Sequence, residues 1–184
     1  DIPYLKIAQE EHDNFAKVLQ ENGARVYYLN DLLAEVLVDE KLRGQFLQEF
    51  LRESHITFPP VYEAVYHYLL DKPVKDMLKC MEAGVRKDEV QVHDNNPLSC
   101  LLQNSGLFYL DPMPNLYFTR DPAAAVSDGL TINRMRMEAR RRESLFIEYI
   151  YRYHPAFSKS KVRLFYDRTF TDNLEGGDEL VLSP

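Results

Sequence analysis

A short segment flanked by prolines carries the first candidate functional side chains. Residues 113–122, MPNLYFTRDP, place an amide, an aromatic ring and the charges of Arg120 and Asp121 in one extended stretch. Polar groups in such a segment need a reason, and the simplest is a strand end where Asp121 caps a turn before Pro122 and Arg120 is solvated. The residue types alone favour the turn.

A second acidic segment lies further along the chain. Residues 174–179, LEGGDE, arrange three carboxylates, Glu175, Asp178 and Glu179, around two glycines that permit unusual backbone angles and close approach of a ligand. Acidic glycine turns are common on protein surfaces. The pattern alone therefore favours a surface turn, with a weak cation-binding loop as the alternative.

Three consecutive arginines lie at the start of a predicted helix. Residues 139–143 read ARRRE, and successive residues of a helix point about 100° apart, so at most one or two of these arginines can face one ligand. The planar fork of Arg140 could hold a carboxylate. We expect Arg141 and Arg142 to be solvated or paired surface charges.

The chain opens with a predicted helix and strand. Apolar residues recur at helical spacing from Leu5 to Leu19, and Asn22-Gly23 supplies a left-handed stop. Residues 25–29, RVYYL, then predict a short apolar strand. Residues 179–184, ELVLSP, likewise begin a strand. Because strands need partners for their backbone groups, the chain is expected to be cut at both ends.

Helical periodicity fills the long middle stretch. Between residues 30 and 106 apolar helical stripes follow one another, and no strand-like alternation interrupts them. First-turn prolines, an Asn-Pro start and helix-ending glycines mark the boundaries: Pro60, Pro73, Gly84, Asn96-Pro97 and Gly106. The stretch predicts a small helical bundle inserted into another fold.

Strand patterns return after the helical stretch. The predicted strands are LFYL (107–110), NLYFTRDP (115–122), AAAV (123–126) and LTI (130–132), the last two joined by a hairpin at Ser127-Asp128-Gly129. A helix from Glu138 to His154 and a strand KVRLFYD (161–167) follow. Strand, strand, helix, strand makes one compact ββαβ unit.

Composition bounds the class of protein. The chain has 184 residues, 45% hydrophobic and 28% charged, which suits one globular domain or a domain carrying an insertion. Its formal charge of −7 without a block of like charge argues against a nucleic-acid partner. No apolar run spans a bilayer and no signal peptide is evident, so we expect no membrane association and a cytoplasmic location.

Cysteines and histidines show no metal-ligand spacing. Cys80 and Cys100 are too few for a disulfide framework, and both are expected to be reduced, buried thiols on apolar helical faces. We expect the histidines to be structural or exposed: His12, His55, His67, His93 and His154. The sequence thus predicts no metal site and no cofactor.

The segments PMPNLYFTRDP, ARRRE and NLEGGDELVLS resemble, in this order, hallmark segments of arginine deiminases, members of the guanidine-modifying enzyme superfamily. The resemblance runs through essentially all of the chain, and the helical insertion separates arginine deiminases from shorter superfamily members. It implies an α/β fold, part of a pseudo-fivefold ββαβ propeller with an inserted α-helical bundle. Residues 1–31 and 107–184 would belong to the propeller, and 32–106 to the bundle.

The resemblance also implies hydrolysis of L-arginine to L-citrulline and ammonia through a covalent cysteine intermediate, without a cofactor. By motif position Asp121 and Glu175 are catalytic, with Asp121 on the guanidinium and Glu175 beside a histidine; Asn115, Phe118 and Arg140 hold the rest of the substrate. A guanidinium pairs best with carboxylates that accept two hydrogen bonds. Since strands alternate faces, residues 115, 118 and 121 can share one pocket only if the segment twists or turns.

The family's histidine, in a His-x-Asp motif, and its cysteine lie after the acidic glycine turn, and this sequence contains neither. We therefore expect residues 1–184 alone to be inactive. The alternatives are another guanidine-modifying hydrolase, an amidinotransferase, or an inactive truncated homologue. L-arginine is the expected partner, and the intact enzyme is expected to be a homo-oligomer.

Overall fold

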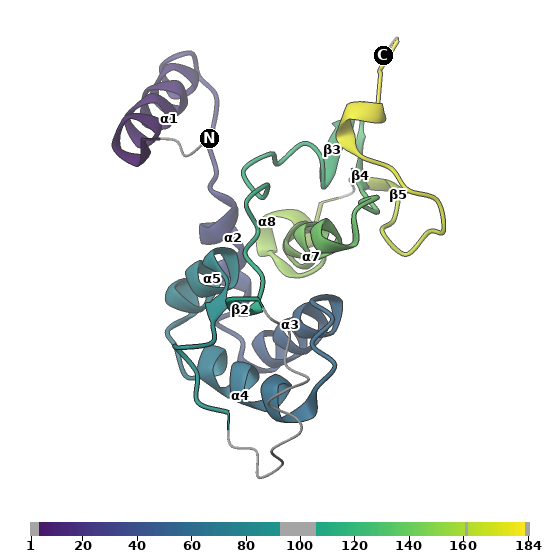
Figure 1. Cartoon of the computed structure of the whole chain (residues 1–184). Helices are drawn as coiled ribbons and strands as arrows, with labels where there is room; N and C mark the ends of the chain where they lie inside the picture. Colours follow the sequence, from purple (N-terminus) through teal and green to yellow (C-terminus); the bar gives the residue numbers. More distant parts are fainter. Residues whose placement is uncertain (1–3, 93–105, 161, 183–184) are drawn as a thin grey trace.

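The computed structural model describes residues 4–92, 106–160 and 162–182 (Figure 1). Its first half is helical, with elements α1 (Leu5–Glu21), α2 (Leu29–Val36), α3 (Glu40–Glu53), α4 (Pro59–Leu70) and α5 (Val74–Ala83). None of the helices in these ranges is both long and apolar enough to cross a membrane.

Local sequence signals set the helix ends. Gly23 adopts a φ of 86° after α1, and Gly84 a φ of 81° after α5, angles that favour glycine. The side chain of Asp39 accepts a hydrogen bond of 3.0 Å from the backbone N–H of Leu42 and so caps α3. Prolines occupy the first turn of α4, as expected from a residue that needs no N–H partner there.

The strand predicted at residues 25–29 is wrong. Residues 24–28 form no regular element, and α2 begins at Leu29. A short apolar run becomes a strand only beside another strand, and no described strand pairs with this one. In Figure 1 the segment is the extended link by which α1 stands apart from the other helices.

One hydrophobic core joins the helical half to the second half of the chain. Phe46 and Phe50 of α3 are fully buried with Phe146 of α7 (Glu138–Tyr153), and the rings of Phe46 and Phe146 meet edge to face at 5.4 Å. Helix α7 also packs against α2. The helical stretch therefore shares its core with α7, and its division from the rest at residues 32 and 106 stays a prediction.

A two-residue strand corrects the expectation that no strand interrupts residues 30–106. Strand β1 (Val85–Arg86) pairs antiparallel with β2 (Phe108–Leu110). Gly84 turns the chain there, and a Cβ atom on it would lie 2.7 Å from the carbonyl oxygen of Leu110. This close approach places residues 85–86 beside β2. The helix predicted from Asn96-Pro97 lies outside the described residues.

The predicted ββαβ unit is confirmed. Strand β3 (Ala123–Val126) pairs antiparallel with β4 (Gly129–Ile132), and β4 pairs in parallel with β5 (Arg163–Tyr166), giving the order β3-β4-β5. Ser127, with a φ of 51°, and Asp128 form the hairpin loop between Val126 and Gly129. Helix α7 and the one-turn α8 (Pro155–Ser158) connect β4 to β5. The fold is of the α/β kind, with a sheet that is open in the described region.

Two further predicted strands are wrong. Residues 115–122 form consecutive turns, in which the N–H groups of Phe118 and Asp121 donate to carbonyls three residues earlier. Residues 179–182 form no strand either, and Leu180 and Leu182 are 81% and 87% exposed. Residues 183 and 184 lie outside the described residues. An exposed segment without a neighbouring strand gains nothing from an extended conformation.

Arg168 follows β5 and links the sheet to two helices. Its side chain is 11% exposed; it contacts Glu53 of α3 and donates to Glu148 of α7 at 3.2 Å and to the carbonyl of Arg141 at 3.0 Å. Arg168→Met leaves two largely buried carboxylates without this partner, so we expect the free energy of unfolding to fall by about 2–4 kcal/mol. Urea denaturation of the protein that contains this chain measures the loss.

Arg152→Met is the matched control for Arg168→Met. Arg152 also pairs with Glu148, at 2.7 Å, but its side chain is 47% exposed. Exposed ion pairs contribute little, so we expect a loss below about 1 kcal/mol. Equal urea midpoints for the two variants would show that the ion pairs of Arg168 do not hold the sheet to α3 and α7.

Candidate functional site

Successive turns give residues 115–121 their shape. The N–H of Phe118 donates to the carbonyl of Asn115 at 3.0 Å, and the N–H of Asp121 donates to the carbonyl of Phe118 at 3.2 Å. Leu116 is buried beneath these turns and anchors them. Because the segment turns, side chains three residues apart can face the same side, whereas a strand would place them on opposite faces.

The acidic glycine segment lies directly against these turns. The N–H of Gly176 donates to the carbonyl of Asp121 at 3.1 Å, and a Cβ atom on Gly176 would lie 2.1 Å from the carbonyl oxygen of Arg120. Glycine is therefore required at 176 by close backbone approach rather than by a special φ. This contact brings Glu175, which precedes the short 3-10 helix η1 (Gly176–Asp178), near Asp121.

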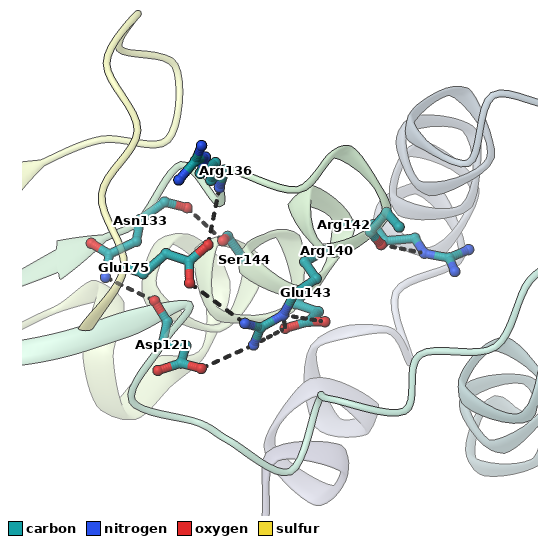
Figure 2. Close-up of polar contacts among 9 residues, drawn as sticks. Asp121, Asn133, Arg136, Arg140, Arg142, Glu143, Ser144 and Glu175 are labelled. Carbon is teal, nitrogen blue, oxygen red and sulfur yellow. Dashed lines mark hydrogen bonds and ion pairs between the residues drawn. The ribbon is translucent and has the colours of Figure 1, made fainter. Parts of the chain in front are cut away.

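The guanidinium of Arg140, in the first turn of α7, lies between Asp121 and Glu175 (Figure 2). Its Nη2 atom is 3.1 Å from Oδ2 of Asp121, and its Nη1 atom is 3.6 Å from Oε2 of Glu175. The other carboxylate oxygen of Glu175 accepts the backbone N–H of Arg136 at 3.1 Å. Asp121 and Glu175 therefore lie close together, with one guanidinium joining them.

Glu143 completes a set of carboxylates around Arg140 that we call the carboxylate cluster: Asp121, Glu143 and Glu175. Nε of Arg140 donates to both oxygens of Glu143 at 3.1 and 3.2 Å, and Nη2 donates to Oε2 at 3.0 Å. Burial raises the pKa of the Glu143 carboxyl, and Arg140 opposes this shift. Burial also acts to lower the pKa of Arg140, but its hydrogen bonds to Glu143 and Asp121 outweigh this and raise it.

The sequence patterns did not single out Glu143. Its only signal is the spacing of three residues from Arg140 in ARRRE, which places the two side chains on one face of a helix. Opposite charges at this spacing are common on exposed helices. What distinguishes this pair is burial, since the Glu143 side chain is 2% exposed, and burial depends on tertiary packing.

Asn115 and Phe118 are not joined to the carboxylate cluster. The ring of Phe118 is 46% exposed and lies 3.9 Å from the ring of Tyr117, measured between centroids. The backbone carbonyl of Asn115 accepts the N–H of Phe118 at 3.0 Å within the turn. Their roles in substrate binding stay predictions.

Asp178 and Glu179 make structural contacts outside the carboxylate cluster. Asp178 accepts the backbone N–H of Glu175 at 3.1 Å and so shapes the turn. Glu179 accepts the hydroxyl of Thr131 at 2.8 Å and the side-chain amide of Asn133 at 3.0 Å. Glu179 therefore holds the acidic segment against β4, while Asp178 acts within the turn.

The prediction that Arg142 is a surface charge is wrong. Its side chain is buried and donates to the carbonyls of Asp111 and Pro112 at 2.6 and 3.1 Å and to the hydroxyl of Ser54 at 3.1 Å. Figure 2 shows it pointing away from the carboxylate cluster, toward the helical half. The segment between β2 and the turns offers these carbonyls as acceptors, and the buried guanidinium of Arg142 donates to them. Arg141 pairs with Glu138 at 3.5 Å, as a partly exposed charge.

Cys80 and the described histidines contribute no nucleophile or acid to the cluster. Cys80 lies half-buried on α5, and burial raises the pKa of its thiol, although Lys72 opposes this. His154 is buried and pairs with Glu35 at 2.9 Å. The other three described histidines, His12, His55 and His67, are exposed. His93 and Cys100 lie outside the described residues.

The three carboxylates of the cluster offer more hydrogen-bond acceptors than the N–H groups of the single Arg140 guanidinium can satisfy. The side chains of Asp121 and Glu175 are 29% and 28% exposed, so a ligand from solvent can reach them. A planar cation with several N–H donors suits such a pair best.

Comparison with known proteins gives one consistent family. The family model described as "Arginine deiminase" matches residues 1–184. Proteins named arginine deiminase from Bacillus cereus and Latilactobacillus sakei are 50% and 46% identical to it over 183 residues. These alignments cover 100% of this chain but 45% of each relative, so the chain spans about half the length of the relatives it matches. From its sequence along its whole length, the chain belongs to the arginine deiminase family.

Proposed function

We propose that the protein containing this chain hydrolyses L-arginine to L-citrulline and ammonia. Membership of the arginine deiminase family and the names of its relatives support this activity. The observation that carries the proposal is that Asp121 and Glu175, from separate motifs, hold a guanidinium group between them, that of Arg140. A substrate guanidinium presents the same donors.

In the proposed reaction Asp121 binds the substrate guanidinium and Glu175 lies beside the histidine that acts as the acid. Arg140 pairs with the α-carboxylate, and Asn115 and Phe118 line the rest of the pocket. A cysteine thiolate attacks the guanidinium carbon, ammonia leaves with a proton from the histidine, and water cleaves the C–S bond to release citrulline. The cysteine and the histidine are proposed to lie outside this chain.

The proposed architecture is a pseudo-fivefold ββαβ propeller, to which residues 1–31 and 107–184 contribute and into which residues 32–106 are inserted. The unit β3-β4-α7-β5 supports it as one such module. The intact enzyme is proposed to be a homo-oligomer, which sedimentation of the purified protein tests.

The alternatives act on the same chemical group. A dimethylarginine hydrolase or an amidinotransferase would also use carboxylates on a guanidinium, and an inactive homologue would bind without turnover. An assay of citrulline and ammonia with L-arginine, and separately with dimethylarginine or with an amine acceptor, distinguishes them. Citrulline and ammonia from L-arginine in equal amounts support the proposal; preference for either alternative substrate would contradict it.

Arg140→Leu in the protein that contains this chain is expected to raise KM for L-arginine strongly. Loss of the Arg140 guanidinium leaves the substrate α-carboxylate unpaired, which reduces the free energy of binding by about 2–4 kcal/mol. Steady-state kinetics measure the change. Arg141→Leu is the control, because Arg141 is adjacent but pairs with Glu138, and its KM should stay near wild type. A wild-type KM for Arg140→Leu would exclude Arg140 as the carboxylate partner.

A further inference from the structure

We propose that Glu143 is a positioning residue that keeps Arg140 in place while the substrate guanidinium takes over Asp121 and Glu175. In the free protein Arg140 pairs with Asp121 and Glu175, and the substrate guanidinium replaces it there. The ion pair between Arg140 and Glu143 remains when the substrate is bound. The inference rests on the proposed function, because it concerns the same site.

The contacts of Arg140 are unequal. Glu143 makes three N–O contacts with it between 3.0 and 3.2 Å, through Nε and Nη2. Asp121 makes one hydrogen bond, of 3.1 Å, and Glu175 contacts Nη1 at 3.6 Å. A two-pronged contact between a guanidinium and a carboxylate is the stronger kind. Arg140 is therefore held firmly on one edge and weakly on the other.

Burial separates the three carboxylates in the same way. The Glu143 side chain is 2% exposed, whereas those of Asp121 and Glu175 are 29% and 28% exposed. A ligand arriving from solvent can therefore displace Arg140 from Asp121 and Glu175 but cannot reach Glu143. Separating Arg140 from Glu143 would leave a buried carboxylate without its cation, which is costly.

The hydrogen-bonding capacity of Arg140 fits an exchange. A guanidinium has five N–H donors, and the contact with Glu143 uses those on its Nε edge. The remaining donors, on Nη1 and Nη2, face Glu175 and Asp121 in the free protein (Figure 2). Once the substrate guanidinium replaces them there, they are free to pair with the α-carboxylate of the same substrate. Glu143 and Arg140 are three residues apart on α7, so their relative position is kept throughout.

The test compares L-arginine with agmatine, which has the guanidinium but no α-carboxylate, as a ligand in calorimetry and as a competitive inhibitor. Arg140→Leu removes the guanidinium that competes for Asp121 and Glu175, so agmatine should bind several-fold more tightly. L-arginine should bind more weakly, because its α-carboxylate loses its partner. Glu143→Gln frees Arg140 to pair more strongly with Asp121 and Glu175. This variant should raise KM for L-arginine and lower the affinity for agmatine, each by about tenfold, and it should change kcat much less.

The double variant separates positioning from a structural role. In an Arg140→Leu background, Glu143→Gln should leave agmatine affinity unchanged, because its effect passes through Arg140. Glu138→Gln is the control, because Glu138 is an exposed carboxylate at the first residue of α7, and this change should alter the affinity for neither ligand. A Glu143→Gln effect of equal size in both backgrounds, or no gain in agmatine affinity for Arg140→Leu, would overturn the inference.

The same measurements keep this inference apart from the proposed function. Absence of citrulline formation by the wild-type protein would contradict the activity, while calorimetry with L-arginine and agmatine would still report the exchange. Normal citrulline formation combined with additive effects of the two substitutions would contradict the exchange and leave the activity standing.

Discussion

A polypeptide limited to residues 1–184 is expected to form no measurable citrulline from L-arginine. It retains Asp121, Arg140 and Glu175, but removal of the covalent nucleophile leaves on the order of a millionth of an enzyme's rate. Cys80 cannot substitute, because it lies half-buried on α5 with a raised thiol pKa, whereas the attacking species is the thiolate. The measurement is a citrulline assay on a preparation whose mass matches these residues.

The control for this prediction is the protein that contains the chain at its natural length, assayed at the same concentration. Cys80→Ser and Cys100→Ser variants of residues 1–184 complete the experiment. Robust turnover that either substitution abolishes would place the nucleophile within this chain, and would overturn the proposed division of the active site.

Asp121→Asn in the protein that contains this chain is expected to lower kcat/KM for L-arginine by at least about a thousandfold. The change keeps the size of the side chain but removes the charge that pairs with the guanidinium. Substitution of one member of a catalytic set typically lowers the rate by roughly three to four orders of magnitude. The loss should appear in kcat as well as in KM, since the carboxylate is proposed to act on the reacting group. Steady-state kinetics measure both.

Asp128→Asn is the matched control for Asp121→Asn. Asp128 lies in the loop between β3 and β4, is 67% exposed, and its nearest cationic partner, Arg163, is 3.9 Å away. Its kinetics should match wild type, because an exposed pair at this distance contributes little. If both variants kept wild-type kcat/KM, the guanidinium would have to be bound by other residues than the cluster.

The sequence alone identified the features that depend on short-range pattern. Helical periodicity predicted a helix from residue 5 to 19 and the mainly helical character of the described residues between 30 and 92, and Gly23 and Gly84 marked helix ends where they occur. The hairpin and the β3-β4-α7-β5 unit also followed from local signals. The acidic and arginine-rich motifs pointed to Asp121, Arg140 and Glu175, and the family resemblance that they supported is confirmed by the comparisons.

The tertiary structure decided which of these local possibilities are realised. Residues 25–29 and 115–122 have strand-like composition, but one lacks a partner strand and the other satisfies its backbone in turns, and composition contains neither fact. Arg142 reads as a surface charge beside two other arginines, yet it is buried and donates to the carbonyls of Asp111 and Pro112, which follow β2.

The site itself depends on contacts between distant segments. Gly176 lies against the backbone of Arg120, and this contact helps to bring Glu175 to Asp121. The sequence determined which side chains were available to bind a guanidinium. Only the packing of α7 against the turns determined that Glu143 is buried and that Arg140 lies among three carboxylates, because burial and charge pairing depend on neighbours that are remote in the chain.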